Sequence, residues 1–192
     1  LYLSALLRPS CTLEQLPALT AWSAVAVCDA VEALCGVRPG IKWPNDVILE
    51  GRKLCGILTE LELEAESGAL RYVGAGIGLN LSQTEADFGP ELAPTAISLA
   101  QALGAAPRRA EATRPLLDGL DRLYADFPRD QAGWLARYPP GCLTVGRPIR
   151  VLFPGRGPDG TPLGVGGSFS SRVAGQTWGR EGLSTGRAPV RG

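Results

Sequence analysis

Two segments with strand character, residues 53–63 and 70–81, constrain the fold more than any other feature of this 192-residue sequence. Glutamates alternate with leucines in the second half of the first segment, so we expect one polar face and one apolar face. Gly68 lies between the two segments and is typical of a turn. The sequence therefore predicts a long antiparallel hairpin.

Further elements are predicted on both sides of this hairpin. Strand character is also found in residues 1–8, 41–43 and 47–49. Helical spacing of apolar residues is found in residues 16–35, 95–103, 109–127 and 130–138. The first of these helices should bury one face, and Thr95 is a candidate cap of the second. The fold class that follows is α+β, a mixed, mainly antiparallel sheet flanked by helices.

The chain divides into a large and a small predicted domain. The run Pro139-Pro140-Gly141 breaks the helical pattern and indicates a linker, so the first domain spans residues 1–141. Strand character in residues 148–153 and 160–165 predicts a small β domain over residues 142–192. Residues 164–192 are rich in glycine, serine and arginine, and their alternation fades after Phe169, so we expect them to be loosely ordered.

Charge and composition exclude several classes of function. Lysine and arginine together number 19, as do aspartate and glutamate, so there is no basic field to hold nucleic acid or an anionic membrane. We find no apolar run approaching the roughly 18 to 20 residues of a membrane span and no leader pattern, and we expect a cytoplasmic protein without a membrane partner. The chain has no histidine, which excludes Ser-His-Asp and Cys-His catalysis. Its five cysteines form no Cys-x-x-Cys pair and are expected to be reduced thiols.

A glycine-rich stretch closes the second strand of the hairpin. Gly74, Gly76 and Gly78 alternate with apolar residues, which removes the side chains from one face of the strand, and Asn80 places an amide at its end. The spacing differs from the dinucleotide-binding pattern G-x-G-x-x-G, and no helix follows directly. The bare face fits either a tight packing contact or a flat ligand lying against the backbone, and the strand alone leaves both open.

Lys53 and Gly56 favour a ligand, and specifically an anion. Lys53 opens the first long strand, where its ammonium group can lie over the sheet, and Gly56 clears space beside it. A charge-assisted hydrogen bond to an anion contributes about 1.5–3 kcal/mol. The alternative is a strand-end lysine that extends into solvent.

The run Lys42-Trp43-Pro44-Asn45-Asp46 groups polar and aromatic side chains between two short strands. Pro44 fixes its own φ and keeps Trp43 extended, while Asn45 and Asp46 occupy the turn. Trp43 is a candidate wall for a purine ring, Lys42 a candidate anion contact, and Asp46 a candidate metal ligand or base for an incoming amine. A plain turn also explains the Pro-Asn-Asp part. Together these roles are typical of phosphate-activated acyl transfer.

Three motifs resemble the catalytic domain of biotin protein ligases in their order and spacing. They are Lys-Trp-Pro-Asn-Asp at residues 42–46, Lys-x-x-Gly-Ile-Leu at 53–58 and Gly-Ile-Gly-Leu-Asn at 76–80. The resemblance implies the class II synthetase-like biotin/lipoate ligase fold, followed by a small SH3-like β domain. It also implies that ATP and Mg²⁺ convert biotin to biotinyl-5′-AMP. A lysine of the biotin carboxyl carrier protein of acetyl-CoA carboxylase would then accept the biotinyl group.

The resemblance implies a role for each matching residue. The catalytic residues would be Lys53, Asp46 and Lys42, with Asp46 also the candidate magnesium ligand. The biotin-binding residues would be Lys53, Gly56, Gly76 and Leu79. The ATP- and adenylate-binding residues would be Lys42, Trp43, Asn45, Gly78 and Asn80.

The sequence also departs from the family pattern. The arginine- and glycine-rich loop that closes over biotin and the adenylate would precede Leu1, so we expect impaired activity from this chain alone. Two alternatives stay open: a lipoate or octanoate protein ligase or transferase on the same fold, and a non-catalytic truncated remnant. The partners implied are biotin, ATP and the carrier protein, with a homodimer as a further option and no nucleic acid.

Overall fold

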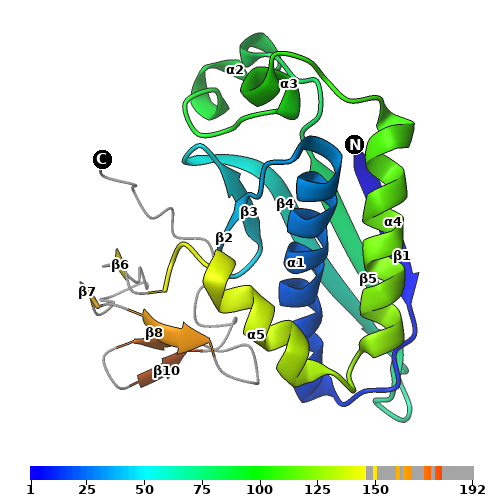
Figure 1. Cartoon of the computed structure of the whole chain (residues 1–192). Coiled ribbons are helices and arrows are strands. Elements are labelled where there is room, and N and C mark those ends of the chain that lie inside the picture. The colour runs from blue at the N-terminus through cyan, green and yellow to red at the C-terminus, as the bar shows by residue number, and fades with distance from the viewer. Residues whose placement is uncertain (146–148, 151–158, 161, 166–170, 174–175, 179–192) are drawn as a thin grey trace.

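The computed structural model describes residues 1–145 and, beyond them, residues 149–150, 159–160, 162–165, 171–173 and 176–178 (Figure 1). Its centre is a five-stranded sheet with strands in the order β1-β5-β4-β3-β2. These strands are β1 (Tyr2–Leu7), β2 (Gly40–Lys42), β3 (Asp46–Leu49), β4 (Arg52–Leu63) and β5 (Leu70–Leu79). Neighbouring strands are antiparallel throughout, and β4 and β5 form the long hairpin that the sequence predicts.

Helices cover one face and one end of this sheet. They are the 3₁₀ helix η1 (Leu13–Gln15) and the α-helices α1 (Leu16–Cys35), α2 (Glu85–Leu92), α3 (Leu99–Leu103), α4 (Arg109–Asp126) and α5 (Gln131–Gly141). Helices α1 and α4 lie against one face, α5 packs beside α1, and α2 and α3 lie together at one end (Figure 1). The mixed α and β architecture, an antiparallel sheet flanked by helices, agrees with the predicted fold class.

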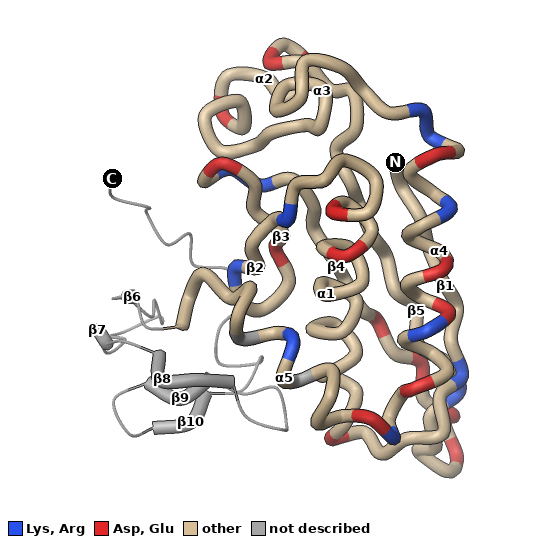
Figure 2. Tube along the Cα trace, in the orientation of Figure 1, with Lys and Arg blue, Asp and Glu red and all other residues tan. Residues whose placement is uncertain are grey.

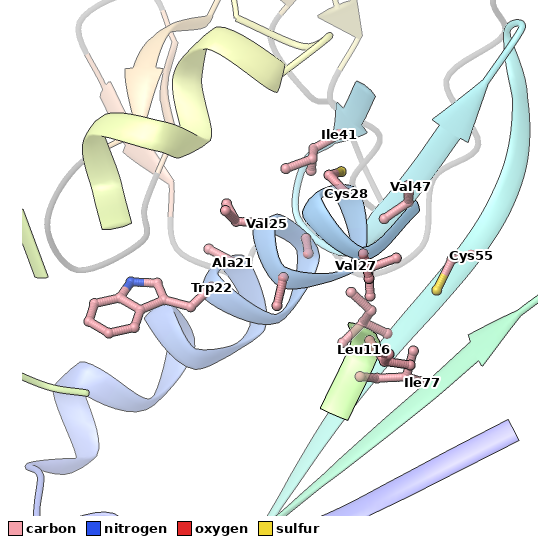
Figure 3. Close-up of a cluster of buried hydrophobic side chains, with 14 of the residues drawn as sticks. Ala21, Trp22, Val25, Val27, Cys28, Ile41, Val47, Cys55, Ile77 and Leu116 are labelled. Carbon is pink, nitrogen blue, oxygen red and sulfur yellow. The ribbon is translucent and has the colours of Figure 1, made fainter. Parts of the chain in front are cut away.

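Helix α1 is buried on nearly all sides rather than on one face, because it lies between the sheet, α4 and α5. Trp22 stacks on Trp134 of α5 with ring centroids 5.1 Å apart, and it meets the edge of the Phe127 ring at 4.9 Å. The other core side chains of α1 shown in Figure 3 include Ala21, Val25, Val27 and Cys28, and those of the sheet include Ile41, Val47 and Ile77. A helix that is apolar all round is the core helix of its domain.

The segment Leu13–Cys35 is also long and apolar enough, by length and composition, to cross a membrane. The expectation that no run approaches this length is therefore wrong by that measure. In the fold, 72% of the most apolar window of the segment is buried against other parts of the chain. A core helix passes the same test.

The start of α3 differs from the prediction. The helix begins at Leu99, and its cap is Ser98, whose Oγ accepts a hydrogen bond from the Gln101 backbone N–H at 3.2 Å. Thr95, the predicted cap, instead accepts a hydrogen bond at its backbone carbonyl from the Lys53 N–H at 2.7 Å. Residues 95–97 therefore run beside the start of β4 and cannot join the helix.

Two further helical features were not predicted. Helix α2 follows Thr84, whose side chain accepts a hydrogen bond from the Asp87 N–H. Helix α5 continues through the Pro139-Pro140-Gly141 run, which forms its last turn rather than a linker. The helical pattern therefore ends three residues later than the prolines suggested.

Beyond α5, the described residues form short strands. They are β6 (Ile149–Arg150), β7 (Asp159–Gly160), β8 (Pro162–Val165), β9 (Ser171–Val173) and β10 (Gln176–Trp178). Strand β6 pairs with β7, and β8, β9 and β10 form a three-stranded antiparallel sheet. Most of the predicted strand 148–153, and most of the stretch expected to be irregular after residue 164, lie outside the described residues.

Both signs of charge are spread over the described part of the chain. Figure 2 shows basic and acidic residues interspersed along α4, where Arg114 pairs with Asp118 at 3.5 Å. This distribution agrees with the equal numbers of basic and acidic residues in the sequence.

Candidate ligand site on the open sheet face

The strand register aligns five residues in one row across the whole sheet. Tyr2 lies opposite Gly78, Gly78 opposite Gly56, Gly56 opposite Asp46, and Asp46 opposite Lys42. Directly opposed residues of neighbouring strands share a face of the sheet. The row therefore crosses the face that lies away from α1 and α4, and it brings together residues from all three sequence motifs.

A β-bulge brings Lys53 onto this face. The pairing of β3 with β4 shifts between Val47 and Ile48, and the adjacent residues Leu54 and Cys55 are both buried, at 0% and 1% exposure. In a regular strand Lys53 and Gly56 would point to opposite faces, because their positions differ by an odd number. The extra residue of the bulge restores a common face for the two.

Lys53 folds back across Gly56 to reach Asp46. Its Nζ lies 2.5 Å from Asp46 Oδ1, and the two side chains are 47% and 25% exposed. A Cβ at Gly56 would lie 3.1 Å from Lys53 Cε and 3.2 Å from Nζ, so the glycine leaves room for the lysine. A partly exposed ion pair contributes about 0–1 kcal/mol, so a bound anion can take the lysine away from Asp46.

The glycines of β5 are not required by packing. A Cβ at Gly74 would meet nothing closer than 3.9 Å, and at Gly76 or Gly78 nothing closer than 3.6 Å, which is ordinary van der Waals contact. The structure therefore favours a ligand over tight packing as the reason for the bare strand face. Gly76 and Gly78 form the floor of an open cavity of about 400 Å³, with Lys53 and Gly56 at its side.

The corner between β2 and β3, residues 42–46, forms one rim of the site. The Asn45 side-chain amide donates to the Ile57 carbonyl at 2.7 Å, and the Asn45 carbonyl accepts from the Ile57 N–H at 3.1 Å. These bonds fix Asn45 against β4 at the cavity wall. Lys42 is partly exposed, lies in the row beside Asp46, and makes no ion pair among the described residues. The Trp43–Pro44 peptide bond is cis.

Three of the predicted site residues are buried in the core or hydrogen-bonded to the backbone. Trp43 is 8% exposed and Leu79 is 3% exposed, and both belong to the hydrophobic core. Leu79 contributes only backbone near the floor, because odd-numbered residues of β5 face the helices. The Asn80 amide donates to the carbonyl groups of Lys53 at 3.3 Å and Ile97 at 3.0 Å, and so joins residues 95–97 to β4.

The cavity also contains residues that the sequence analysis missed. Tyr2, Ser4 and Leu58 line it, and Leu58 is 54% exposed although it is a large apolar residue. Leu58 could have been identified from the sequence, because it lies two residues after Gly56 and therefore shares its strand face. The β1 residues could be found only from the pairing of β1 with β5, which places Ser4 opposite Gly76.

The described residues include no cluster of three or more His, Cys, Asp or Glu side chains able to hold a metal ion. Asp46 is the carboxylate that lies in the row with the glycines and Lys42. Mg²⁺ is commonly bound through one or two carboxylates together with substrate phosphates. A single aspartate is thus compatible with a metal that arrives on a nucleotide.

The chain is similar in sequence and in fold to a class of protein ligases. Residues 1–80 match the model of the Biotin/lipoate A/B protein ligase family. The chain is 41% identical over 179 residues to the bifunctional ligase/repressor BirA of Bacillus spizizenii, a match that covers 93% of this chain and 48% of the relative. It is 36% identical over 134 residues to the biotin--[acetyl-CoA-carboxylase] ligase of Mycobacterium tuberculosis, covering 68% of this chain and 46% of that protein. This chain is therefore a relative of the biotin protein ligases, and it spans about half the length of the curated relatives it matches.

Solved structures agree on the fold. The biotin protein ligase from Aquifex aeolicus in complex with biotin and ATP superposes with a TM-score of 0.75 at 24% identity, covering 90% of this chain and 70% of that one. The R40G mutant of the same enzyme in complex with biotin gives a TM-score of 0.77 at 23% identity. At this level of identity the likeness shows that the sheet and its helices share one architecture.

Proposed function

We propose that this chain carries the catalytic domain of a biotin protein ligase. In the proposed reaction a biotin carboxylate oxygen attacks the α-phosphorus of ATP, forming biotinyl-5′-AMP and releasing pyrophosphate. A lysine amine of a biotin carboxyl carrier protein then attacks the acyl carbon, and AMP leaves. The names of the relatives support this choice, since one is a biotin--[acetyl-CoA-carboxylase] ligase and another is a bifunctional ligase/repressor.

The observation that carries the proposal is the glycine floor beside a single lysine. The floor of Gly76 and Gly78 accepts a flat body, Leu58 offers an apolar wall, and the Lys53 ammonium lies at the side of the cavity. This combination suits a compact carboxylic acid that carries apolar surface. Biotin is such an acid, with an apolar valerate chain and thioether ring beside its polar ureido group.

Lys53 and Asp46 suggest how the two steps are linked. When Lys53 pairs with the biotin carboxylate and the phosphoryl oxygens, it stabilises the charge that develops there. The same movement separates Lys53 from Asp46, whose carboxylate then becomes available to accept a proton from the attacking carrier lysine. The rest of the rate enhancement would come from holding the reactants in place, which needs no histidine.

The nucleotide would lie toward the corner. Lys42 would meet phosphate oxygens, because it lies beside Asp46 in the row across the sheet. Asn45 and Gly78 line the cavity, and Trp43 and Asn80 would support the backbone around it. Mg²⁺ would supply charge neutralisation on the phosphates, with Asp46 as its candidate protein ligand.

A lipoate or octanoate ligase is the second candidate, because the matching family model covers both biotin and lipoate enzymes. Isothermal titration of the protein with biotin and with lipoate separates the two. Tighter binding of lipoate would replace biotin as the substrate in this account.

We also propose that residues 142–192 form the small SH3-like β domain that follows such catalytic domains. Two small antiparallel sheets among the described residues, β6–β7 and β8–β10, support this. The boundary would lie at Gly141, where α5 ends.

The proposed activity is tested by pyrophosphate release in the presence of biotin and ATP. The wild type should release pyrophosphate only when both are present, and Lys53→Ala should lower the rate by at least about a hundredfold, in the range found when a key charge-stabilising group is removed. Arg52→Ala is the matched control, since Arg52 is the adjacent cation and pairs with Glu50 at 3.5 Å. A wild type without biotin-dependent release would favour the non-catalytic alternative, and an unchanged rate in Lys53→Ala would remove that residue from the mechanism.

A further inference from the structure

The end of α5 and the residues after it contact the corner on the side away from the cavity. The Thr144 Oγ1 accepts a hydrogen bond from the Trp43 backbone N–H at 3.1 Å, and the Tyr138 hydroxyl donates to the Pro44 carbonyl at 3.4 Å. The Leu143 N–H donates to the Ile41 carbonyl at 2.7 Å. Residues 138–144, which we term the supporting segment, thus contact three of the four successive residues from 41 to 44.

The supporting segment is itself fixed to the core. Trp134, one turn before Tyr138, stacks on Trp22 of α1, and its Nε1 donates to Asp126 Oδ2 at 3.0 Å. Arg137 lies over the Trp134 ring, 4.7 Å from its centroid, and forms an ion pair with Asp29 of α1. The helix end is therefore anchored to the most buried helix of the domain.

The corner is held from both sides. On the side of the cavity, Asn45 is bonded to Ile57 of β4 through its side chain and its backbone. On the opposite side, Tyr138 is 1% exposed, and burial followed by the neighbouring Cys142 raises the pKa of its phenol well above the usual value. The phenol therefore stays protonated and able to donate at neutral pH.

We infer that Tyr138 and Thr144 are positioning residues of the ligase reaction, which set the corner so that Lys42, Asn45 and Asp46 face the substrates. This inference rests on the proposed function. Neither side chain lines the cavity, so neither touches biotin there. Their effect passes through the backbone of Trp43 and Pro44, directly before Asn45 and Asp46.

The test compares Tyr138→Phe and Thr144→Val, each of which removes one polar contact while keeping nearly the same shape. In both variants kcat for biotin-dependent pyrophosphate release should fall about tenfold, because small displacements of reacting groups lower rates strongly. The KM for biotin should change by less than about twofold, since the floor belongs to β4 and β5. Thr144→Ser keeps the acceptor and should restore kcat. Tyr124→Phe is the control, because Tyr124 makes a comparable bond to the Arg8 carbonyl at 2.9 Å on α4.

A second measurement does not depend on turnover. Amide hydrogen exchange of Asn45 and Asp46 should accelerate in both variants and not in Tyr124→Phe. Exchange that rises only at Trp43, or an active wild type with both variants at wild-type kcat, would overturn the positioning role. A wild type that releases no pyrophosphate would instead contradict the proposed function, and the exchange result would still decide whether the supporting segment holds the corner.

Discussion

Gly76 and Gly74 lie on the same face of β5, two positions apart, but only Gly76 lines the cavity. A Cβ fits sterically at both positions. Replacing a glycine in a strand interior by alanine stabilises a fold by about 0.5–1 kcal/mol when the new group fits. Substitutions at these two positions therefore distinguish the effect of a glycine on stability from its effect on ligand binding.

Gly76→Ala should raise the free energy of unfolding slightly while weakening biotin binding about tenfold, because the new methyl group occupies the floor of the site. Gly74→Ala should give the same gain in stability and leave the affinity within about twofold. Urea unfolding and isothermal titration measure the two quantities. Equal affinities in the two variants would mean that biotin does not lie on this strand.

Some site residues could be predicted from the motifs, and the surroundings of others could not. The motifs identified Lys53, Gly56 and Asp46, which the structure brings together. The motifs could not reveal that Trp43 and Leu79 are core residues, because the direction of a side chain depends on strand register and on the helices behind the sheet.

Among the helices and strands, those that depend on a local sequence pattern were predicted well. The β4–β5 hairpin, α1 and α4 are close to their predicted bounds, since their alternation or helical spacing is contained in the segment itself. The bulge at Leu54 depends on pairing with β3, so no local pattern indicated it. The expected apolar face at the end of β4 was also wrong, because Leu61 and Leu63 are 51% and 38% exposed.

The cap at the start of α3 should contribute to the stability of the fold. Ser98 is fully buried, caps the helix, and donates to the Gln83 carbonyl at 2.7 Å, so Ser98→Ala should lower the free energy of unfolding by about 1–2 kcal/mol. Thr95→Ala should change it by less than about 0.5 kcal/mol, as for an ordinary exposed side chain. Urea denaturation of both variants checks this. A larger loss for Thr95→Ala would restore the boundary that the sequence suggested.

Two buried thiols in the core should make the stability of the whole molecule fall at alkaline pH. Burial raises the pKa of the Cys28 thiol and of the Cys55 thiol to about 12 from an ordinary value of 9.0. A raised pKa means that the folded state holds the proton more tightly than the unfolded state. The contribution is therefore intact below pH 9.0 and is lost as the pH rises toward 12.

Comparison of the wild type with Cys55→Ala measures this contribution. Between about pH 8 and about pH 10, the free energy of unfolding of the wild type should fall by roughly 1 kcal/mol more than that of Cys55→Ala. Cys35→Ala, at a partly exposed position, should keep most of the wild-type fall. Parallel curves for the wild type and Cys55→Ala would show that the Cys55 thiol ionises normally in the fold.

We propose that biotin lies on the glycine floor of the open sheet face. Titration of the ¹⁵N-labelled protein with biotin, followed through the amide chemical shifts, tests this placement. We expect the largest shift changes at Gly56, Gly76 and Gly78, with little change at Gly40 and Gly141, which border a separate hollow beside α5. Changes centred on Gly40 and Gly141, or no change at the three floor glycines at saturating biotin, would contradict it.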